Sequence, residues 1–438
     1  MNKIIISLVS VSVLAACSLF GKDPLDIEGE RISVIRENRN LQPDYVAGEL
    51  KIRLPKSELN SQWSQAGGNA SHYMQHLKAG GNLDEIWDVS FGKGSSKRDV
   101  LITSPVSDGK NFYTLDSKGI TQAYSLKDGE KIWRKRLKHS NKKNRDASII
   151  GAGLAVYDGK LFATTGFGKV FALNAENGET LWEQDLKSPI RIAPTVDEDL
   201  VIVQTIDNAI YAIKINDGDI LWKDKIESES TTMIGGAAPA FSVKDDLVVA
   251  AFSNGQLQAY KASTGTPLWS EWVISGEATD SIAEITSIRA NPVIADGFVY
   301  AGGYSGPLVA IDIRTGVKVW VKDIAITSQP WVAGNFLFVL DNDGDLAAIE
   351  RSTGKIVWSS IIPAANSDKK SDIVIAGPIL TNDALLVVTS TGKLYSVSPY
   401  NGRIMGVADV DDDVETTPLM VNEVLLLTTK DAKITAYK

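Results

Sequence analysis

Two groups of side chains in this sequence have residue types and spacings that could hold a metal ion. His72 and His76 are four residues apart, which would place both imidazoles on one face of a helix, as zinc ligands can be. No third ligand is evident nearby, so zinc is not expected. The stretch from Asp341 to Glu350 is rich in the carboxylates that calcium loops use. Its glycine is at the fourth position and its glutamate at the tenth, instead of the sixth and twelfth, so we expect no calcium there.

A denser group of carboxylates precedes Pro418. It comprises Asp409, Asp411, Asp412, Asp413 and Glu415. We interpret it as a solvated loop on one rim of the fold instead of a cation site, and we interpret His139, in a basic stretch, as part of a solvated loop. The sequence has no Gly-x-Ser-x-Gly elbow, no phosphate-binding loop and no dinucleotide-binding fingerprint. We therefore predict no catalytic residue, no metal and no cofactor.

The elements that carry these residues follow from a tandem repeat, which has to be identified before any other assignment of the fold. Each copy begins with Gly, passes through Ala and a hydrophobic residue to a turn residue plus Gly, and closes on Trp. Gly168–Trp182 and Gly255–Trp269 are two clear copies. The six complete copies end at Trp133, Trp182, Trp222, Trp269, Trp320 and Trp358. A seventh has Gly406 in place of the Trp, and the end of the chain cuts an eighth in half.

The residue types in each period of about 45 residues predict four short strands. The residues around the repeat Ala are rich in β-formers. The Asp-Gly, Asn-Gly or Thr-Gly pair that follows allows positive φ in a tight hairpin. Between one Trp and the next copy, a Pro and an alternating run mark two more strands. Four strands per period are typical of one propeller blade.

The half copy at the C-terminus lacks its Trp strand, and the segment around Trp87 supplies one at the other end of the chain. We therefore predict an all-β fold, an eight-bladed β-propeller of four-stranded blades closed by pairing of the N- and C-terminal strands. Closure would remove two open edges that otherwise favour aggregation. The tryptophans would act as wedges between blades. The junction at Gly406 is expected to be looser or filled by another side chain.

The first 16 residues have the features of an export signal, because Lys3 precedes an apolar run too short to span a bilayer well. The sequence Leu14-Ala15-Ala16-Cys17 resembles the lipobox of bacterial lipoproteins. The resemblance implies cleavage before Cys17 and acylation of its thiol, palmitate included. An ordinary secretory peptide is the alternative. Cys17 is the only cysteine, so no disulfide is expected.

The remaining organisation follows from the leader and the repeats. Residues 1–16 are expected to be the signal peptide, residues 17–60 the lipidated Cys and a tether, and residues 61–438 the propeller. Ser18 is not the Asp that lipoprotein rules associate with inner-membrane retention. We therefore expect a lipid anchor on the periplasmic face of the outer membrane. The formal net charge of −9, with charges of mixed sign, does not favour a nucleic-acid partner.

The repeat is similar to that of the quinoprotein superfamily, whose propellers include pyrroloquinoline-quinone dehydrogenases. With the lipobox, the tether and eight blades, the chain resembles the BamB family, and WSQAGGNASHYMQHL from Trp63 resembles the opening of some members. The resemblance implies a non-catalytic scaffold lipoprotein of the outer-membrane β-barrel assembly complex. Such a protein binds the POTRA domains of the central barrel subunit and aids insertion of outer-membrane proteins. Nascent outer-membrane proteins are further candidate partners.

In that family two neighbouring inter-blade loops meet the POTRA domains, and here they correspond to residues 226–239 and 274–292. The Arg of the enterobacterial Leu-x-Leu-Arg-Gly motif is replaced by Ile234. The resemblance implies contacts at Thr231, Met233, Ile234, Gly235, Glu284, Ser287, Ile288 and Arg289. Met233 and Ile234 would suit a small hydrophobic hot spot. The alternative is that both pack into the blade junction.

Two other functions stay open at this stage. A quinone-dependent periplasmic dehydrogenase is disfavoured, because many such enzymes hold the quinone against an adjacent Cys pair and this chain has a single Cys. Nothing in the sequence excludes a propeller that binds the cell wall or a polysaccharide.

Overall fold

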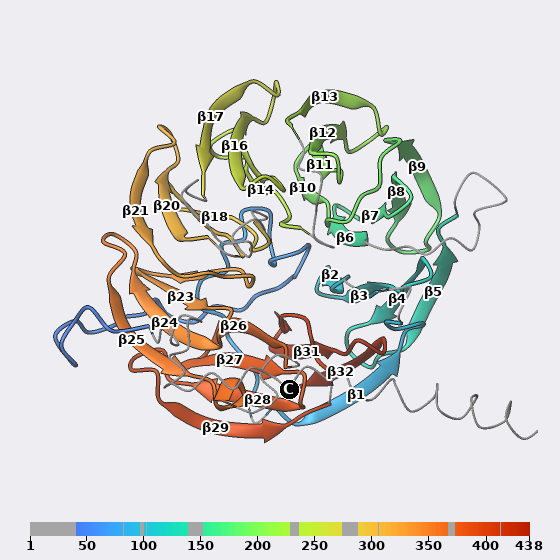
Figure 1. The fold of residues 1–438 in the computed structure, drawn as a ribbon. Helices are drawn as coiled ribbons and strands as arrows, with labels where there is room; N and C mark the ends of the chain where they lie inside the picture. Colours follow the sequence, from blue (N-terminus) through green and yellow to red (C-terminus); the bar gives the residue numbers. More distant parts are fainter. Residues whose placement is uncertain are drawn as a thin grey trace, which may run out of the picture. The chain divides into compact units, whose positions relative to one another are not determined.

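The chain from Leu41 onward forms a ring of eight four-stranded sheets, the blades of a β-propeller (Figure 1). The computed structural model describes residues 41–81, 83–96, 100–101, 103–138, 152–227, 236–273, 288–304, 306–366, 373–411 and 413–438. Neighbouring strands pair antiparallel, as β2 does with β3 and β10 with β11. In these ranges no helix has the length and apolarity needed to cross a membrane.

Blades 1 to 7 are each built from four consecutive strands, with the first strand of each nearest the centre of the ring (Figure 1). The strands of blades 1 to 4 are β2 (Val106–Ser107), β3 (Asn111–Leu115), β4 (Ile120–Ser125), β5 (Lys131–Arg136), β6 (Ala152–Tyr157), β7 (Lys160–Thr165), β8 (Lys169–Asn174), β9 (Thr180–Asp185), β10 (Thr195–Asp197), β11 (Leu200–Gln204), β12 (Ala209–Lys214), β13 (Ile220–Lys225), β14 (Ala240–Ser242), β15 (Leu247–Ala251), β16 (Gln256–Lys261) and β17 (Pro267–Trp272). Those of blades 5 to 7 are β18 (Val293–Ala295), β19 (Phe298–Gly302), β20 (Leu308–Asp312), β21 (Lys318–Lys322), β22 (Trp331–Ala333), β23 (Phe336–Leu340), β24 (Asp345–Glu350), β25 (Ile356–Ile361), β26 (Ile375–Thr381), β27 (Ala384–Thr389), β28 (Lys393–Val397) and β29 (Ile404–Asp409). A short 3-10 helix, η3 (Pro363–Asn366), follows β25.

Blade 8 is shared by the two ends of the chain. It consists of β30 (Leu419–Val421), β31 (Val424–Thr428), β32 (Lys433–Tyr437) and, as its outer strand, β1 (Glu85–Ser90). β1 pairs antiparallel with β32, and Trp87 lies opposite Ala436. The predicted closure by terminal strands is confirmed, and the ring has no unpaired end between its first and last blades.

Tryptophans fasten seven junctions between neighbouring blades. Trp222 illustrates the arrangement: it lies opposite the repeat alanine Ala212, and its indole Nε1 donates a 2.6 Å hydrogen bond to the carbonyl of Ala262 in the next blade. The indole also covers Gly265, where φ is +73° and an added Cβ would lie 2.6 Å from the ring. The turn glycine is therefore needed for its backbone conformation and for the space it leaves. The equivalent hydrogen bonds, 2.7–3.1 Å long, start from Trp87, Trp133, Trp182, Trp269, Trp320 and Trp358.

The eighth junction, between blades 7 and 8, has no tryptophan. A Cβ on Gly406 would meet no atom within 4 Å, and its neighbours Met405 and Val407 are about half exposed. This agrees with the looser junction expected from the sequence. The physical reason lies in blade 8, whose two outer strands are the ends of the chain. No hairpin connects β32 to β1, so there is no turn glycine on which a tryptophan at position 406 could pack.

Residues 58–80, here called the central segment, lie at the centre of the ring (Figure 1) and bond to every blade. The eight contacts, in blade order, are Trp63 N to Ser107 O (2.9 Å), Val156 N to Ser64 O (2.7 Å), Val196 N to Gln65 Oε1 (2.7 Å), Phe241 N to Ala70 O (2.7 Å), Ile294 N to Ser71 O (2.9 Å), Trp331 Nε1 to Gln75 O (2.7 Å), Leu77 N to Leu380 O (3.0 Å) and Gly80 N to Glu423 O (3.1 Å). One irregular segment thus ties all eight innermost strands together.

Part of the expected tether also contacts the propeller. The backbone N–H of Asp44 donates to the carbonyl of Ile356 at 2.8 Å, and its carboxylate pairs with Lys322 at 2.6 Å. The Tyr45 hydroxyl donates to Glu350 at 2.7 Å. These contacts tie residues 44–45 to β21 of blade 5 and to β24 and β25 of blade 6.

Candidate functional site

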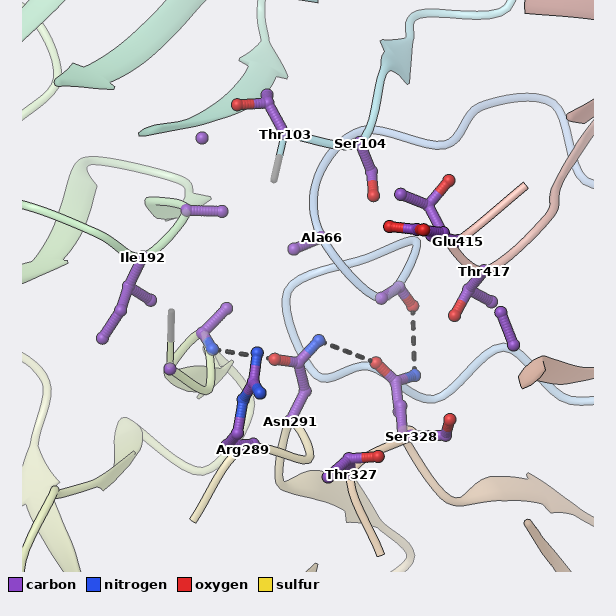
Figure 2. Close-up of a pocket in the computed structure, with 18 of the residues that line it drawn as sticks. Ala66, Thr103, Ser104, Ile192, Arg289, Asn291, Thr327, Ser328, Glu415 and Thr417 are labelled. Carbon is purple, nitrogen blue, oxygen red and sulfur yellow. Dashed lines mark hydrogen bonds between the residues drawn. The ribbon is translucent and has the colours of Figure 1, made fainter. Parts of the chain in front are cut away.

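The connections that lead into the eight blades converge on a central cavity of about 640 Å³ (Figure 2). Each connection contributes residues just before or at the start of its innermost strand, as Ser104 does before β2, Ile192 before β10 and Thr327 before β22. Trp63 of the central segment and Trp331 of β22 also line it, with their ring centroids 6.4 Å apart and their planes 26° apart. Both indoles are almost fully buried, so they form a rigid apolar part of the wall.

A chain of amides joins three blades to the central segment beside this cavity. The backbone N–H of Ala238 donates to the side chain of Asn291 at 2.8 Å, and Asn291 donates to Gln329 at 3.1 Å. Gln329 in turn donates to the carbonyls of Gly67 and His72, at 3.4 and 3.1 Å. Figure 2 shows the links from Ala238 to Gly67 as dashed lines. The connections into blades 4 and 5, which contain the two loops singled out in the sequence, are thus hydrogen-bonded to each other.

The charged residues that line the cavity are Arg191, Arg289 and Glu415. The Nε atom of Arg191 is buried and has no hydrogen-bond partner in the described part of the chain. Burial lowers the pKa of the Arg289 guanidinium, because the cation has lost part of its hydration. With two cations and one carboxylate, the described lining is electropositive. It is suited to binding an anion, and its described residues show no nucleophile paired with a base.

Of the eight residues expected to contact a partner, two belong to the described residues. Ile288 is 2% exposed and packs in the hydrophobic cluster between blades 4 and 5 together with Ala237, so its side chain supports the connection from beneath. Arg289 lines the cavity. Thr231, Met233, Ile234, Gly235, Glu284 and Ser287 lie outside the described residues, as do Cys17 and His139.

The two histidines that could have shared a helix face lie in irregular backbone of the central segment instead. His72 has a φ of +61°, and its Nδ1 lies 2.7 Å from the carbonyl oxygen of Pro292. The Nδ1 of His76 lies 2.7 Å from the carbonyl oxygen of Pro55. Burial lowers the pKa of His72 to about 4, so its ring is neutral near pH 7. In the described ranges no three His, Cys, Asp or Glu side chains form a cluster suited to a metal ion.

The acidic stretches have structural partners. Asp341 accepts hydrogen bonds from the backbone N–H groups of Asp343 and Asp345, at 2.9 and 2.7 Å, and so holds the turn before β24. Burial raises the pKa of Asp341 to about 7. The acidic run before Pro418 was interpreted as a solvated loop. Asp409 instead ends strand β29, where its exposed carboxylate pairs with Lys393 of β28. Asp411 and Asp413 follow that strand, are partly buried, and pair with Lys433 and Lys430 of blade 8.

The sequence analysis did not identify Arg191 as a residue of the cavity, and it did not predict that the central segment contacts every blade. Arg191 stands between the Trp of blade 2 and the innermost strand of blade 3, the position from which every blade lines the cavity. Marking that position in each period would have identified it. The central segment has no repeat and no periodicity, so its contacts could not be derived from pattern.

Comparisons with known proteins agree on one family. A family model described as "Outer membrane protein assembly factor BamB" matches residues 85–360. The protein of that name from Yersinia pestis is 23% identical over 446 aligned positions, which cover 99% of this chain and 98% of that protein. The crystal structure of BamB from Moraxella catarrhalis has a TM-score of 0.69 at 22% identity, and covers 81% of this chain and 99% of that one. Quinohemoprotein alcohol dehydrogenase from Comamonas testosteroni has a TM-score of 0.66 at 13% identity, covering 86% and 80%. At these identities the two structures show likeness of fold alone.

Proposed function

Because this chain belongs to the BamB family, we propose that it is a non-catalytic assembly factor that helps to insert β-barrel proteins into the outer membrane. The observation that carries this proposal is the family match from β1 through β25, which spans six blades and the strand that closes the ring. A rigid ring whose connections converge on one face is suited to presenting loops to a protein partner. The likeness to the dehydrogenase concerns the fold, which unrelated functions share.

The partner in this proposal is the central barrel subunit, bound through its POTRA domains by the connections into blades 4 and 5. The hydrogen bond from Ala238 to Asn291 and the shared packing of Ala237 and Ile288 support the idea that residues 226–239 and 274–292 act as one surface. Within it, we propose contacts at Thr231, Met233, Ile234, Gly235, Glu284, Ser287 and Arg289, with Ile288 fixing the base of the second loop. The Arg of the enterobacterial Leu-x-Leu-Arg-Gly motif is replaced by Ile234, so either the partner surface has co-adapted or the contact of the first loop is more apolar.

The proposed location is the periplasmic face of the outer membrane, with acylated Cys17 as the anchor. Several acyl chains give stable anchoring, whereas one gives only marginal binding. Labelling cells with radioactive palmitate tests the anchor. The wild-type chain should incorporate label, and Cys17→Ser should lose both the label and the membrane association. A labelled Cys17→Ser variant would contradict the assignment.

Affinity purification from outer membranes in mild detergent tests the function. The tagged wild type should co-purify with the central barrel subunit, and the double variant Met233→Asp/Ile234→Asp should lose it while keeping its unfolding midpoint. The matched control is Leu181→Asp on the outer strand β9, a side chain that is 48% exposed and far along the chain from both loops. It should retain the partner.

The outcomes separate the function from the interface. If the double variant still captures the barrel subunit, the assembly role stands and the contact residues are wrong. If the wild type captures no assembly subunit, the proposed function is wrong, and retention on peptidoglycan and dye reduction with added quinone become the next assays.

A further inference from the structure

The outer strand of each blade ends its sheet, and the chain protects these eight edges unequally. An unprotected edge offers backbone N–H and C=O groups to a strand of another chain, and charged residues or proline normally prevent such pairing. In the described part of the chain, six outer strands have a charge or a proline among their first five residues. These are β1, β5, β9, β13, β17 and β21. The strands β25 (IVWSSI) and β29 (IMGVAD) have neither there.

The edge of β25 is covered by the chain's own residues 41–45. This segment runs antiparallel to the strand, with Asp44 beside Ile356 and Leu41 beside Ser359. The N–H of Asp44 donates to the carbonyl of Ile356 at 2.8 Å, and the N–H of Ile356 donates to the Asp44 carboxylate at 2.7 Å. The chain thus shows how an extended segment binds to an uncharged outer strand.

The residue before the blade tryptophan shows the effect of this cover. Val357 of β25 is 9% exposed, and Tyr45 and Leu50 pack against the hydrophobic cluster that contains it. At the same position the other seven blades have an apolar side chain that is 44–51% exposed. These residues are Ile86, Ile132, Leu181, Leu221, Leu268, Val319 and Met405. On β29 every residue from Met405 to the end of the strand is exposed, so the described residues give it no comparable cover.

Blades 6 and 7 also share a cation at the entry to the outer strand. Lys355 precedes β25, and its Nζ lies 5.3 Å from the centre of the Tyr45 ring. Arg403 is exposed at the same position before β29. The other hairpins have Glu130, Glu179, Asp219, Thr266 and Val317 there. A cation favours a carboxylate or an aromatic ring beside it, so the edges of β25 and β29 suit segments of the same chemistry.

Resting on the proposed function, we propose that the edge of β29 binds an extended segment of an unfolded client protein by antiparallel strand addition. The segment has an acidic residue followed by an aromatic one beside Arg403, the order found in residues 44–45. Its apolar side chains cover Met405 and Val407. Strands of β-barrel membrane proteins alternate apolar and polar residues, so clients of an assembly factor contain extended segments of this kind. Main-chain hydrogen bonds supply the affinity, which allows many different clients to bind.

Ile404 is the residue through which strand addition can be tested. It has the register position of Ile356, next to the same bulge, so its N–H and C=O correspond to those that Ile356 directs at Asp44. Blade 4 has Pro267 at this position, so a proline is compatible with the blade. Ile404→Pro therefore removes an outward donor while the pairing of β29 with β28 is retained.

Fluorescence anisotropy with the full-length protein tests binding to β29. The probe is a labelled peptide with the sequence of residues 41–50. The chain's own copy keeps β25 occupied, because an intramolecular contact has a high effective concentration. We expect saturable binding below about 1 mM and a loss of about fivefold in Ile404→Pro, as for one hydrogen bond. The matched control is Ile220→Pro at the same position of β13, which should leave the affinity unchanged. If Ile404→Pro shifts the unfolding midpoint, Arg403→Glu replaces it and should weaken binding by a similar factor.

A photo-reactive amino acid in place of Met405 tests the client in cells. We expect crosslinks to outer-membrane β-barrel proteins, identified by mass spectrometry, and their loss when Ile404→Pro is added. The control position is Leu221 on β13, which is 44% exposed and should give none. Ile404→Pro should still co-purify with the central barrel subunit, because the proposed contact loops lead into blades 4 and 5. Failure of the proposed function would instead appear as a wild type without the barrel subunit.

Three results would overturn the proposal. The first is an equal affinity of the peptide for the wild type and Ile404→Pro, which would place the binding elsewhere. The second is an equal loss in Ile404→Pro and Ile220→Pro, which would make the effect a general one of proline on outer strands. The third is crosslinking from position 405 only to the central barrel subunit or to a second copy of this chain, which would make β29 an interface within the complex.

Discussion

Replacement of Trp222 by alanine measures how strongly one wedge holds two blades together. The indole is 9% exposed, stacks on Tyr260 with ring centroids 5.7 Å apart, and donates its N–H to the carbonyl of Ala262. A buried Trp removes roughly 150–250 Å² from water, worth about 4–6 kcal/mol at about 25 cal/mol per Å². Part of that gain is already present in a compact unfolded chain, and core Trp→Ala changes cost about 3–5 kcal/mol. We expect the free energy of unfolding to fall by about that amount.

The assay is equilibrium unfolding in guanidinium chloride, followed by both circular dichroism and fluorescence so that coincident transitions establish a single step. The matched control is Trp272→Ala, which removes the same side chain from the outer strand of the next blade, β17, at a position that is 51% exposed. Its cost should stay within about 1 kcal/mol, because exposed positions away from such packing contribute little. Equal losses in the two variants would refute the wedge as the source of stability.

Three further predictions concern the same structure. Gly265→Ala should lower the free energy of unfolding by about 2–4 kcal/mol, from the left-handed backbone and the contact with the Trp222 ring; a cost below about 0.5 kcal/mol in urea unfolding would contradict it. Gly406→Trp should change the free energy of unfolding by no more than about 0.5 kcal/mol, because blade 8 has no turn glycine to receive the ring, and a clear gain would disprove that account. Because burial lowers the pKa of His72 from 6.5 to about 4, its neutral form contributes about 3 kcal/mol of stability that is present above pH 6.5 and lost as the pH falls toward 4. The raised pKa of Asp341 changes the stability in the opposite direction over the same pH range. The measurement is therefore the difference in the free energy of unfolding between the wild type and His72→Asn as a function of pH, because asparagine tolerates the positive φ at position 72. Parallel pH profiles of the two proteins would contradict a contribution from His72.

The repeat was sufficient to predict the blades, because each residue type in it satisfies a local steric requirement. Ala212 can only be small, since Trp222 lies opposite it, and Gly265 can only be glycine, since the indole covers it. Each of these constraints joins residues that are no more than about one period apart in the sequence. The pairing of β1 with β32 was also predictable, because an incomplete copy at one end implied its complement at the other.

The site was harder to predict, because its residues do not repeat. Arg191, Arg289 and Glu415 come from the connections into three different blades, and only the closed ring brings them to one cavity. The spacing of His72 and His76 indicated a helix face, yet both imidazoles bond to carbonyls of Pro292 and Pro55. Those acceptors are distant in sequence for His72, so no local pattern could have revealed them. The ion pairs of Asp411 and Asp413 were not predictable from local pattern either, since their lysine partners come from blade 8.

The central segment and β1 impose an order of events on synthesis. They are among the first residues of the described chain to be made, and their partners include β30 to β32, the last. Contacts of such long sequence separation form late, because the intervening chain must be ordered first. A chain that stops before Lys433 lacks β32, so β1 has no strand to pair with and the ring stays open. These residues can therefore complete their contacts only after the whole chain has been made. An incomplete product keeps an unpaired strand that proteases and chaperones can recognise.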